Sequence, residues 1–211
     1  MKISYSILTH NETDSLLNLI HFIMKHKDDE DEIVILDDFS DNEKTKEILD
    51  SAVSIYEIKF EQRHLLKDYA GQKNHLTRMC KGDYIINIDA DELPHKYLMK
   101  NIKEILESNT TIDLYYVPRI NTVEGLTQDH INKWRWNVNE KGWINFPDWQ
   151  GRIWRNRPNI RWERPVHEML VGFKEYAFLP QEEEYCFYHP KTIDKQEKQN
   201  KKYSGIINDK S

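Results

Sequence analysis

The sequence feature that most constrains the fold is a short apolar run that ends in acids. Residues 84–92 read Tyr-Ile-Ile-Asn-Ile-Asp-Ala-Asp-Glu, with Gly82 before the run and Pro94 after it. An apolar run of this length, bounded by turn residues, predicts a strand buried on both faces of a parallel sheet. The carboxyl ends of such strands open into the crevice where ligands bind. We therefore expect Asp89 and Asp91 at the rim of a ligand site.

The first half of the chain repeats this order of strand, polar residues and helix. Apolar runs and alternation predict strands at residues 3–8, 33–36, 54–60 and 84–89. Helices are expected between them, because residues such as Leu16, Ile20 and Ile23 recur at helical spacing. Successive strand–helix units form a parallel sheet with right-handed crossovers. The predicted class is α/β, with a mostly parallel central sheet flanked by helices.

Beyond residue 113 the composition changes. Residues 119–165 hold all six tryptophans and several arginines. Short strands are expected at residues 114–117, 152–154, 160–162 and 184–188, and a polar helix or tail at 194–203. Aromatic faces stack on the C–H faces of sugar rings, but large aromatic side chains also fill cores. We expect at least half of the tryptophans in the core and some facing a ligand.

Length, charge and cysteine content restrict the class of protein. With 211 residues, 38% of them hydrophobic, the chain suffices for one sizeable core, so we expect a single domain. The net charge of −6 argues against a general nucleic-acid binder, which would carry a basic face. Cys80 and Cys186 form no disulfide framework, so both are expected to be buried thiols in a reducing cytoplasm. The apolar stretch at residues 16–24 is too short to span a bilayer.

The acids at the strand ends suggest a metal and a nucleotide. Asp89 and Asp91 repel one another unless a cation lies beside them, and their oxygens suit Mg2+ or Mn2+. No Gly-x-Gly-x-x-Gly loop is present to hold phosphates, so a metal is expected to neutralise them. His189 is a candidate nitrogen ligand. Asp38 is expected in the same crevice, where it either accepts a hydrogen bond from a base or, with its neighbouring aspartates, caps the next helix.

Val166, His167 and Glu168 place an imidazole and a carboxylate side by side after the tryptophan-rich segment. A carboxylate can take a proton from a sugar hydroxyl if burial and nearby acids tune it for that task. The alternative interpretation is an ordinary surface pair, just as a solvated acidic turn is the alternative for Asp89 and Asp91.

Together these segments resemble the GT-A, family 2 inverting glycosyltransferases. The matching motifs are Ser-Ile-Leu-Thr-His-Asn-Glu at residues 6–12, Ile-Leu-Asp-Asp-Phe-Ser-Asp at 35–41, Gly-Gln-Lys-Asn at 71–74, and the segment 81–92. Residues 147–155 and 166–168 also resemble the bacterial lipopolysaccharide-core glucosyltransferase branch. The length and tail resemble the amino-terminal glycosyltransferase domain of a large chlorella-virus protein. We therefore expect a viral protein that acts in the host cytoplasm and belongs to a longer chain.

The resemblance implies a site as well as a fold. Within one GT-A domain over residues 1–211, residues 1–118 would bind the nucleotide sugar, and residues 119–211 would bind the acceptor and supply the base. The residues around the nucleotide sugar would be Thr9, Asp38, Lys73, Asp89, Ala90 and Asp91. Asp91 and His189 would hold Mn2+ or Mg2+. Glu168 would be the catalytic base, with Asp148, Glu92 and Glu163 as the other candidates.

The expected reaction is a metal-dependent, inverting transfer of a hexose or deoxyhexose, of glucose or rhamnose type, from a UDP-sugar to a glycan hydroxyl. A sugar-phosphate nucleotidyltransferase is a rival enzyme, but it needs a Gly-rich loop where this chain has Thr-His-Asn-Glu at residues 9–12. A non-catalytic glycan-binding module is the rival of another class, and the tryptophans are its only support.

Overall fold

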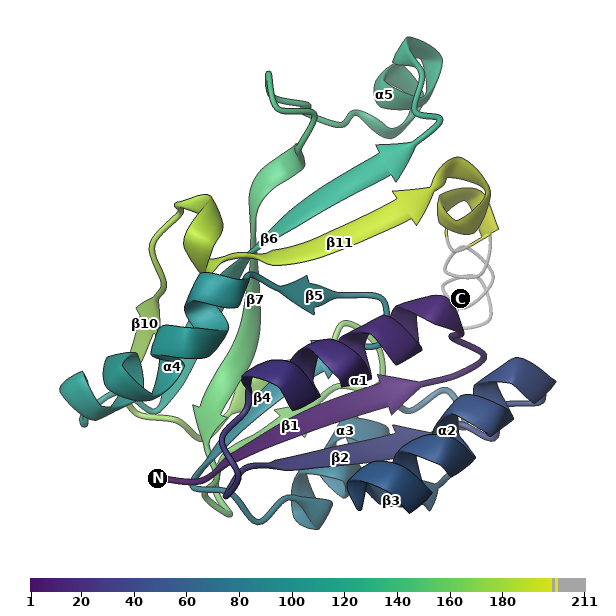
Figure 1. Ribbon diagram of the computed structural model, residues 1–211. Helices are drawn as coiled ribbons and strands as arrows, with labels where there is room; N and C mark the ends of the chain where they lie inside the picture. The colour runs from purple at the N-terminus through teal and green to yellow at the C-terminus, as the bar shows by residue number, and fades with distance from the viewer. Residues whose placement is uncertain (199, 201–211) are drawn as a thin grey trace.

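The apolar runs of the first half form parallel neighbouring strands. The computed structural model describes residues 1–198 and 200. In it, β1 (Ile3–Thr9) pairs in parallel with β2 (Glu32–Asp37) and with β4 (Tyr84–Asp89), and β3 (Lys59–Gln62) pairs in parallel with β2. Because these strands share one direction, the carboxyl ends of β1, β2 and β4 lie at one edge of the sheet (Figure 1). The predicted α/β class is confirmed.

The second half of the chain extends the same sheet with strands of both directions. β7 (Ile144–Arg155) pairs antiparallel with β4 and with β6 (Leu114–Glu124), and β11 (Phe187–Thr192) pairs in parallel with β6. Two short strands, β5 (Leu93–Pro94) and β10 (Tyr176–Phe178), pair with β11 and β6 respectively. β7 therefore joins the two predicted halves beside the acidic end of β4.

Three helices cover one face of the sheet, as Figure 1 shows: α1 (Asp14–His26), α2 (Glu43–Tyr56) and α4 (Lys96–Ser108). Their apolar residues recur at helical spacing, which gives each helix one buried stripe. In α1 the buried residues are Leu16, Leu19, Ile20 and Ile23. These stripes meet the apolar side chains of β1, β2 and β4 in the larger hydrophobic cluster.

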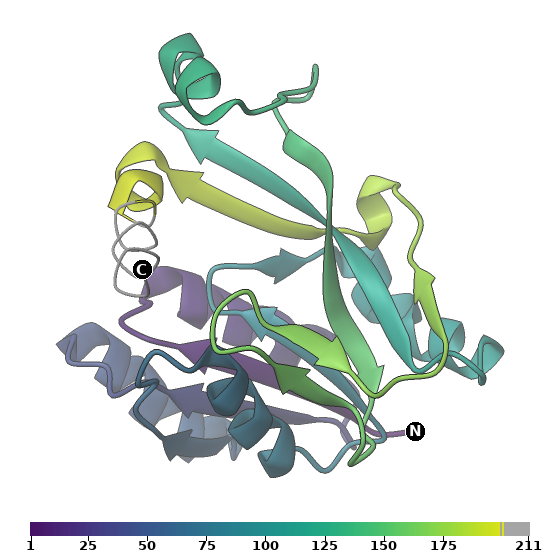
Figure 2. The same cartoon turned by 180° about the vertical axis from the view of Figure 1, so that it is seen from behind.

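The opposite face carries α3 (Tyr69–Met79) and a two-stranded hairpin of β8 (Arg161–Glu163) and β9 (Met169–Val171), which is seen in Figure 2. Their apolar side chains form a second cluster with those of β2, β4 and β6. The amide of Tyr69 donates a hydrogen bond to the carbonyl of Pro165, at 2.9 Å. This contact fixes the hairpin loop, which contains the residues that precede β9, against the start of α3.

The predicted strand at residues 54–60 is misplaced, because the third strand, β3, begins only at Lys59. α2 continues to Tyr56, and Glu57 ends it in the left-handed conformation, with φ 53°. Ala52 is buried, whereas the side chain of Ile55 is 67% exposed. The apolar alternation that suggested a strand therefore includes residues on the solvent side of a helix, and tertiary packing overrode the local pattern.

The predicted strand at residues 184–188 is misplaced. Residues Glu183–Tyr185 form a 3-10 turn (η1), and β11 begins at Phe187, where parallel pairing with β6 starts. His189 consequently lies inside a strand rather than after one. The pairing partner that lengthens the strand, β6, is distant in sequence, so a local pattern cannot reveal it.

The second half of the chain also contains two short helical segments. α5 (Gln128–Trp134), which lies between β6 and β7, was not predicted. Residues 193–198 are helical, in agreement with the polar helix expected at 194–203. Residues 199 and 201–211, including the end of that predicted helix, lie outside the described residues.

The tryptophans are less buried than expected. All six lie in the described residues, but only Trp154 and Trp162 are buried, at 1% and 6% exposure. Trp134 packs on Trp136 with ring centroids 4.6 Å apart, and Trp149 packs on Phe178 at 4.8 Å. The segment around α5 projects from the sheet (Figure 1), so its aromatic rings cover one another instead of joining a core.

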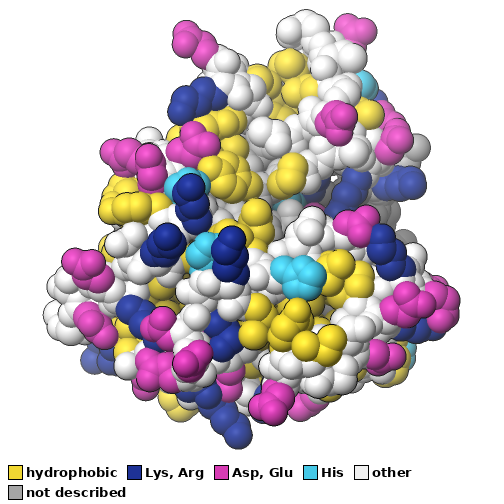
Figure 3. Space-filling model, in the orientation of Figure 1, with side chains coloured by type: hydrophobic (Ala, Val, Ile, Leu, Met, Phe, Trp, Pro, Cys, Tyr) yellow, Lys and Arg dark blue, Asp and Glu magenta, His cyan; other side chains and the backbone are white. Residues whose placement is uncertain are grey.

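Three predictions about composition can be compared with the structure. Cys80 and Cys186 are free and buried, as expected. No helix in the described part of the chain is long and apolar enough to cross a membrane. On the face seen in Figure 3, basic and acidic side chains are interspersed, and no extended basic surface is visible there.

The end of the β8–β9 hairpin depends on Gly172, which has a φ of +85°. A Cβ atom at this position would lie 1.8 Å from the carbonyl oxygen of Asn159. Gly172→Ala should therefore destabilise the protein by more than the ordinary left-handed penalty of about 1–2 kcal/mol. Gly142→Ala is the control, because Gly142 has a φ of +76° but no atom within 4 Å of the added Cβ. Equal urea midpoints for the two variants would contradict this prediction.

Candidate active site

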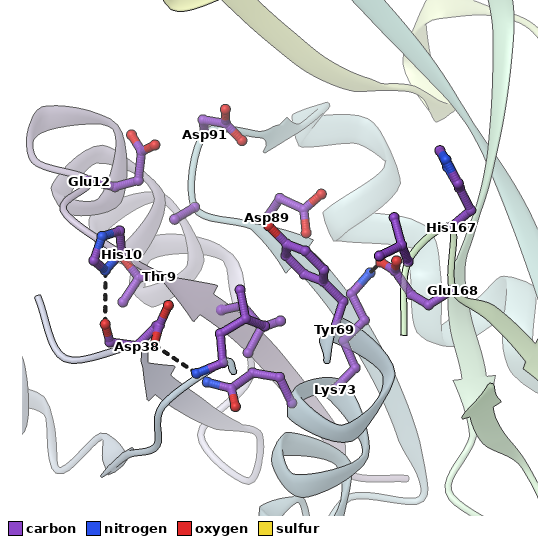
Figure 4. A pocket seen from close by; sticks show the side chains of 15 residues that line it. Thr9, His10, Glu12, Asp38, Tyr69, Lys73, Asp89, Asp91, His167 and Glu168 are labelled. Carbon is purple, nitrogen blue, oxygen red and sulfur yellow. Dashed lines mark hydrogen bonds and ion pairs between the residues drawn. The ribbon is translucent and has the colours of Figure 1, made fainter. Parts of the chain in front are cut away.

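The carboxyl ends of β1, β2 and β4 open into a pocket with a volume of about 370 Å³. A volume of this size is typical of a small-molecule site. The predicted residues that line it are Thr9, Asp38, Lys73, Asp89, Ala90, Asp91 and Glu168. Figure 4 shows Thr9 and Asp38 at one end, Glu168 beside His167 at the other, and Asp89 and Tyr69 between them. The fold has thus brought five separate segments of the chain to one place.

The Asp38 end of the pocket is built from two loops that follow β1 and β2. The carboxylate of Asp38 accepts a hydrogen bond from the amide of Leu65 at 2.8 Å, and its carbonyl accepts one from His10 Nδ1 at 2.8 Å. The hydroxyl of Thr9 is buried and has no hydrogen-bond partner among the described residues. Asn42, rather than Asp38, caps α2 with its side chain. The helix-capping interpretation of Asp38 is therefore wrong.

Asp89 is held by an arginine of β7. Arg152 is buried, and its Nη2 atom lies 2.5 Å from Asp89 Oδ2 and 2.5 Å from Glu92 Oε1. Burial alone would raise the pKa of Asp89, but the charges of Arg152 and Lys73 more than offset this effect. The pKa of Asp89 therefore lies well below its usual range, and the carboxylate stays ionised at the wall of the pocket.

The same network extends to β6. Arg119 donates to Glu92 at 2.9 Å and to Asp148 at 2.6 Å, so two arginines and three carboxylates form one partly buried cluster. Burial would raise the pKa of Asp148, but the charge of Arg119 and hydrogen bonds from Asn121 lower it below its usual range. In this cluster Glu92 and Asp148 both form ion pairs with arginines.

The four candidates for the catalytic base differ in their surroundings. Glu92 and Asp148 are engaged by arginines, and Glu163 is an exposed residue of β8 that pairs with Arg161 at 2.7 Å. Within the described residues, Glu168 is the one candidate of the four that lines the pocket. The geometry therefore favours Glu168 over the other three, although its role stays a prediction.

Glu168 is paired with Lys73 of α3. Lys73 Nζ lies 2.6 Å from Glu168 Oε1 and 4.3 Å from the ring centroid of Trp162, and Lys73 is 7% exposed. A charge-assisted hydrogen bond of this length holds the carboxylate in a fixed position. Lys73 was expected beside the uridine, and in this structure its ammonium instead contacts Glu168, as the dashed line in Figure 4 marks.

Asp91 and His189, the predicted metal ligands, lie together. His189 Nε2 is 3.4 Å from Asp91 Oδ2, while His189 Nδ1 donates to Asn121 Oδ1 at 2.7 Å. His189 does not line the pocket itself. Burial would raise the pKa of Asp91, but His189 and Lys195 lower it well below its usual range. A carboxylate oxygen and an imidazole nitrogen therefore face one another at the rim.

The two candidate ligands, Asp91 and His189, fit a metal ion that a substrate also helps to bind. Within residues 1–198 and 200, no group of three or more His, Cys, Asp and Glu side chains is arranged to hold a metal ion. Mg2+ and similar ions are often bound by one or two protein ligands together with substrate phosphates and water. Asp91 and His189 match that arrangement. They do not match a structural site that the protein completes alone.

Several residues of the site were missed from the sequence. Arg152 and Arg119 are two arginines among several in the second half, and only the pairing of β4, β7 and β6 directs them at Asp89 and Glu92. Lys195 lies in a polar helix that carries no motif. The local sequence therefore contains no pattern that could have identified these three cations.

Comparison with known proteins agrees with the fold. An α/β sheet with an acidic crevice at the carboxyl ends of its strands defines a class of ligand-binding enzyme folds. The family model described as "Glycosyl transferase family 2" matches residues 4–173. The chain belongs to glycosyl transferase family 2. The predicted family is confirmed, whereas the expected chlorella-virus origin stays a prediction.

Curated relatives match part of this chain. An uncharacterized glycosyltransferase of Rickettsia conorii is 32% identical over 111 residues, which are 51% of this chain and 35% of that protein. One of Rickettsia bellii is 35% identical over 107 residues, or 51% of this chain and 33% of that protein. The chain thus spans about a third of the length of these relatives.

Solved structures share the fold. S. aureus TarS, residues 1–349, has a TM-score of 0.59 at 15% identity, over 90% of this chain and 60% of that one. The same protein in complex with UDP-GlcNAc has a TM-score of 0.57 at 14% identity, over 90% and 58%. At this identity the likeness concerns the fold alone, and it confirms the predicted GT-A architecture.

The buried cluster around Arg152 predicts a large stability effect. Arg152→Ala would leave the buried Glu92 and the partly exposed Asp89 beside one another without this cation, so the free energy of unfolding should fall by about 3–5 kcal/mol. Arg161→Ala is the control, because it breaks an exposed pair with Glu163 and should change stability by less than about 1 kcal/mol. Urea denaturation measures both. A loss for Arg152→Ala no larger than that of the control would show that the cluster does not stabilise the sheet.

Proposed function

We propose that this chain carries a metal-dependent, inverting glycosyltransferase activity that moves a hexose or deoxyhexose from a UDP-sugar to a glycan hydroxyl. The observation that carries the proposal is the single pocket in which Asp38, Asp89, Asp91 and Glu168 meet. Family membership supports sugar transfer. The UDP-GlcNAc complex of TarS, which has a similar fold, supports a nucleotide-sugar donor.

The base of the donor fits the Asp38 end of the pocket. One oxygen of Asp38 is held by the amide of Leu65, which orients the carboxylate. Uracil carries an N–H that such a carboxylate can accept, and the buried hydroxyl of Thr9 has a hydrogen bond still to make. We assign these two residues to base recognition. The ribose would then lie near Asp89, whose orientation is set by Arg152.

The diphosphate belongs at the rim beside Asp91. Asp91 and His189 would hold Mn2+ or Mg2+ there, together with the diphosphate oxygens. When bound, the metal supplies Lewis-acid stabilisation of the leaving diphosphate. Asn121 holds His189 through Nδ1 and so directs Nε2 toward Asp91.

Glu168 is the base in this proposal. Its carboxylate takes the proton of the acceptor hydroxyl as the acceptor oxygen bonds to the anomeric carbon. The bond from that carbon to the diphosphate oxygen breaks, and UDP leaves with the bonding electrons. One such displacement inverts the anomeric centre. The ion pair with Lys73 supports this role, because it holds the carboxylate in position in the pocket.

The two rival functions have less support. A nucleotidyltransferase would need a phosphate-binding Gly-rich loop after β1, and residues 9–12 contain no glycine. A glycan-binding module would draw on the half-buried tryptophans, but it gives the pocket acids no task. We place the reaction in the cytoplasm, which the free thiols of Cys80 and Cys186 support. The domain is proposed to act within a longer protein, and glucose or rhamnose is the proposed donor sugar.

The metal proposal is tested by binding of UDP. In wild type, EDTA should weaken UDP binding, because the diphosphate charge loses its compensating cation. Asp91→Ala should weaken UDP binding and remove the response to EDTA. Asp50→Ala, at an exposed position of α2, is the control and should behave as wild type. Calorimetry with and without EDTA measures these affinities. Wild-type affinity that does not respond to EDTA would exclude the metal.

The base proposal is tested by separating binding from turnover. Glu168→Gln keeps the shape of the side chain and removes its charge, so UDP affinity should be retained while transfer falls roughly 10²–10⁴-fold. The control is Glu163→Gln, which alters an exposed carboxylate on the same hairpin. Release of UDP is measured with an acceptor that supports wild-type turnover, and thermal melting checks folding. Near wild-type transfer by Glu168→Gln would reassign the base.

A further inference from the structure

The last described segment of the chain reaches the rim of the pocket. β11 ends at Thr192, and the helical residues 193–198 follow it. Lys195 lies in this helical turn, and its Nζ atom is 2.7 Å from Glu12 Oε1 and 3.1 Å from Asp91 Oδ2. Figure 1 shows the turn next to the start of α1, where the loop after β1 ends. One ammonium therefore joins the loop after β1 to the loop after β4.

Both acids that Lys195 contacts line the pocket. They come from the loops that the proposed function assigns to the donor, and Asp91 is the proposed metal ligand. The side chain of Lys195 is 42% exposed, so the pair with Glu12 by itself adds little to stability. The position of this ion pair matters more than its strength, because it places a partly exposed cation where the diphosphate would lie.

A second lysine, Lys191, lies in the same region of charge. Lys191 is partly buried on β11, four residues before Lys195, and it lies within the electrostatic influence of Asp91, Asp89 and Lys195. β11 and the turn after it therefore direct His189 and Lys195 toward Asp91, and Lys191 adds a positive charge to the same region.

We propose that Lys195 is a ligand of the donor diphosphate, which exchanges its contact with Asp91 for the diphosphate oxygens when the donor binds. This inference rests on the proposed function, since it assumes a nucleotide diphosphate in the pocket. A diphosphate next to Asp89, Asp91 and Glu12 brings more negative charge than one divalent cation neutralises. The chain has no Gly-rich loop whose amides would share that task.

The chemistry of lysine suits this exchange. An ammonium has three donor hydrogens on a flexible stem, so it can keep Glu12 while a second hydrogen turns from Asp91 to a phosphate oxygen. Asp91 would then be free to bind the metal together with His189. In the free protein, the contact with Lys195 neutralises Asp91 and holds the turn after β11 over the rim.

The competing explanation is that Lys195 only anchors the helical turn to Glu12. The two explanations differ in the effect of removing each partner. If the ion pair is only an anchor, Lys195→Ala and Glu12→Gln break the same contact and should act alike. If Lys195 binds diphosphate, Glu12→Gln removes a negative charge beside the ligand and leaves the lysine in place. Loss of the lysine should then weaken UDP, and loss of the acid should not.

The experiment is calorimetry of the 211-residue chain with UDP and with uridine, both in the presence of Mn2+. For Lys195→Ala we expect UDP to bind roughly 10- to 100-fold more weakly, the scale of one hydrogen bond to a charged group. Uridine affinity should be unchanged, since uridine has no diphosphate. Lys195→Arg should restore most of the UDP affinity. Lys198→Ala, an exposed lysine on the same helical turn, is the control and should match wild type.

Glu12→Gln should bind UDP at least as tightly as wild type, and melting temperatures confirm that each variant folds. The inference is overturned if Lys195→Ala binds UDP as wild type does, if UDP and uridine weaken by the same factor, or if Glu12→Gln and Lys195→Ala lose UDP affinity equally. Wild type that binds no UDP would instead overturn the proposed function, and this inference with it. The two failures are therefore distinguishable.

Discussion

The structure depends on how the carboxylates at the end of the central strand are neutralised. Asp89 ends β4, and Glu92 lies three residues later with its side chain fully buried. A buried acid such as Glu92, with a second acid beside it, is tolerated only when cations and hydrogen bonds compensate the charge. The cations are Arg152 of β7 and Arg119 of β6, both from the second half of the chain. The requirement for charge compensation therefore ties the second half of the chain to the acidic end of the first.

This arrangement explains why β7 runs beside β4. Antiparallel pairing places Ile86 opposite Ile153, which brings Arg152 level with the carboxyl end of β4. The hairpin that follows β7 packs on α3, and there the ammonium of Lys73 lies over the ring of the buried Trp162. Glu168 is reached by the same lysine. The two halves of the chain thus form the pocket together, and ion pairs between them hold them in position.

In the free protein, several acids of the pocket already form ion pairs with a lysine or an arginine. Asp89 has Arg152, Glu168 has Lys73, and Asp91 shares Lys195 with Glu12. A negatively charged ligand would therefore exchange partners within an existing set of charges rather than enter an uncompensated acidic crevice. The buried pair of Asp89 with Arg152 is suited to remain, whereas the more exposed contacts of Lys195 are suited to change.

The sequence by itself determined the parallel strands and the acids at their ends. Residues 84–89 and 33–36 are apolar runs whose strand character needs no distant partner, and parallel topology brings their carboxyl ends together. Only the tertiary structure decided that residues 54–56 are helical, that His189 lies inside a strand, and that most of the tryptophans stay out of the core. It also decided which arginines and lysines meet the acids. The physical reason is that ion pairs join residues far apart in the chain, and local periodicity carries no information about such partners.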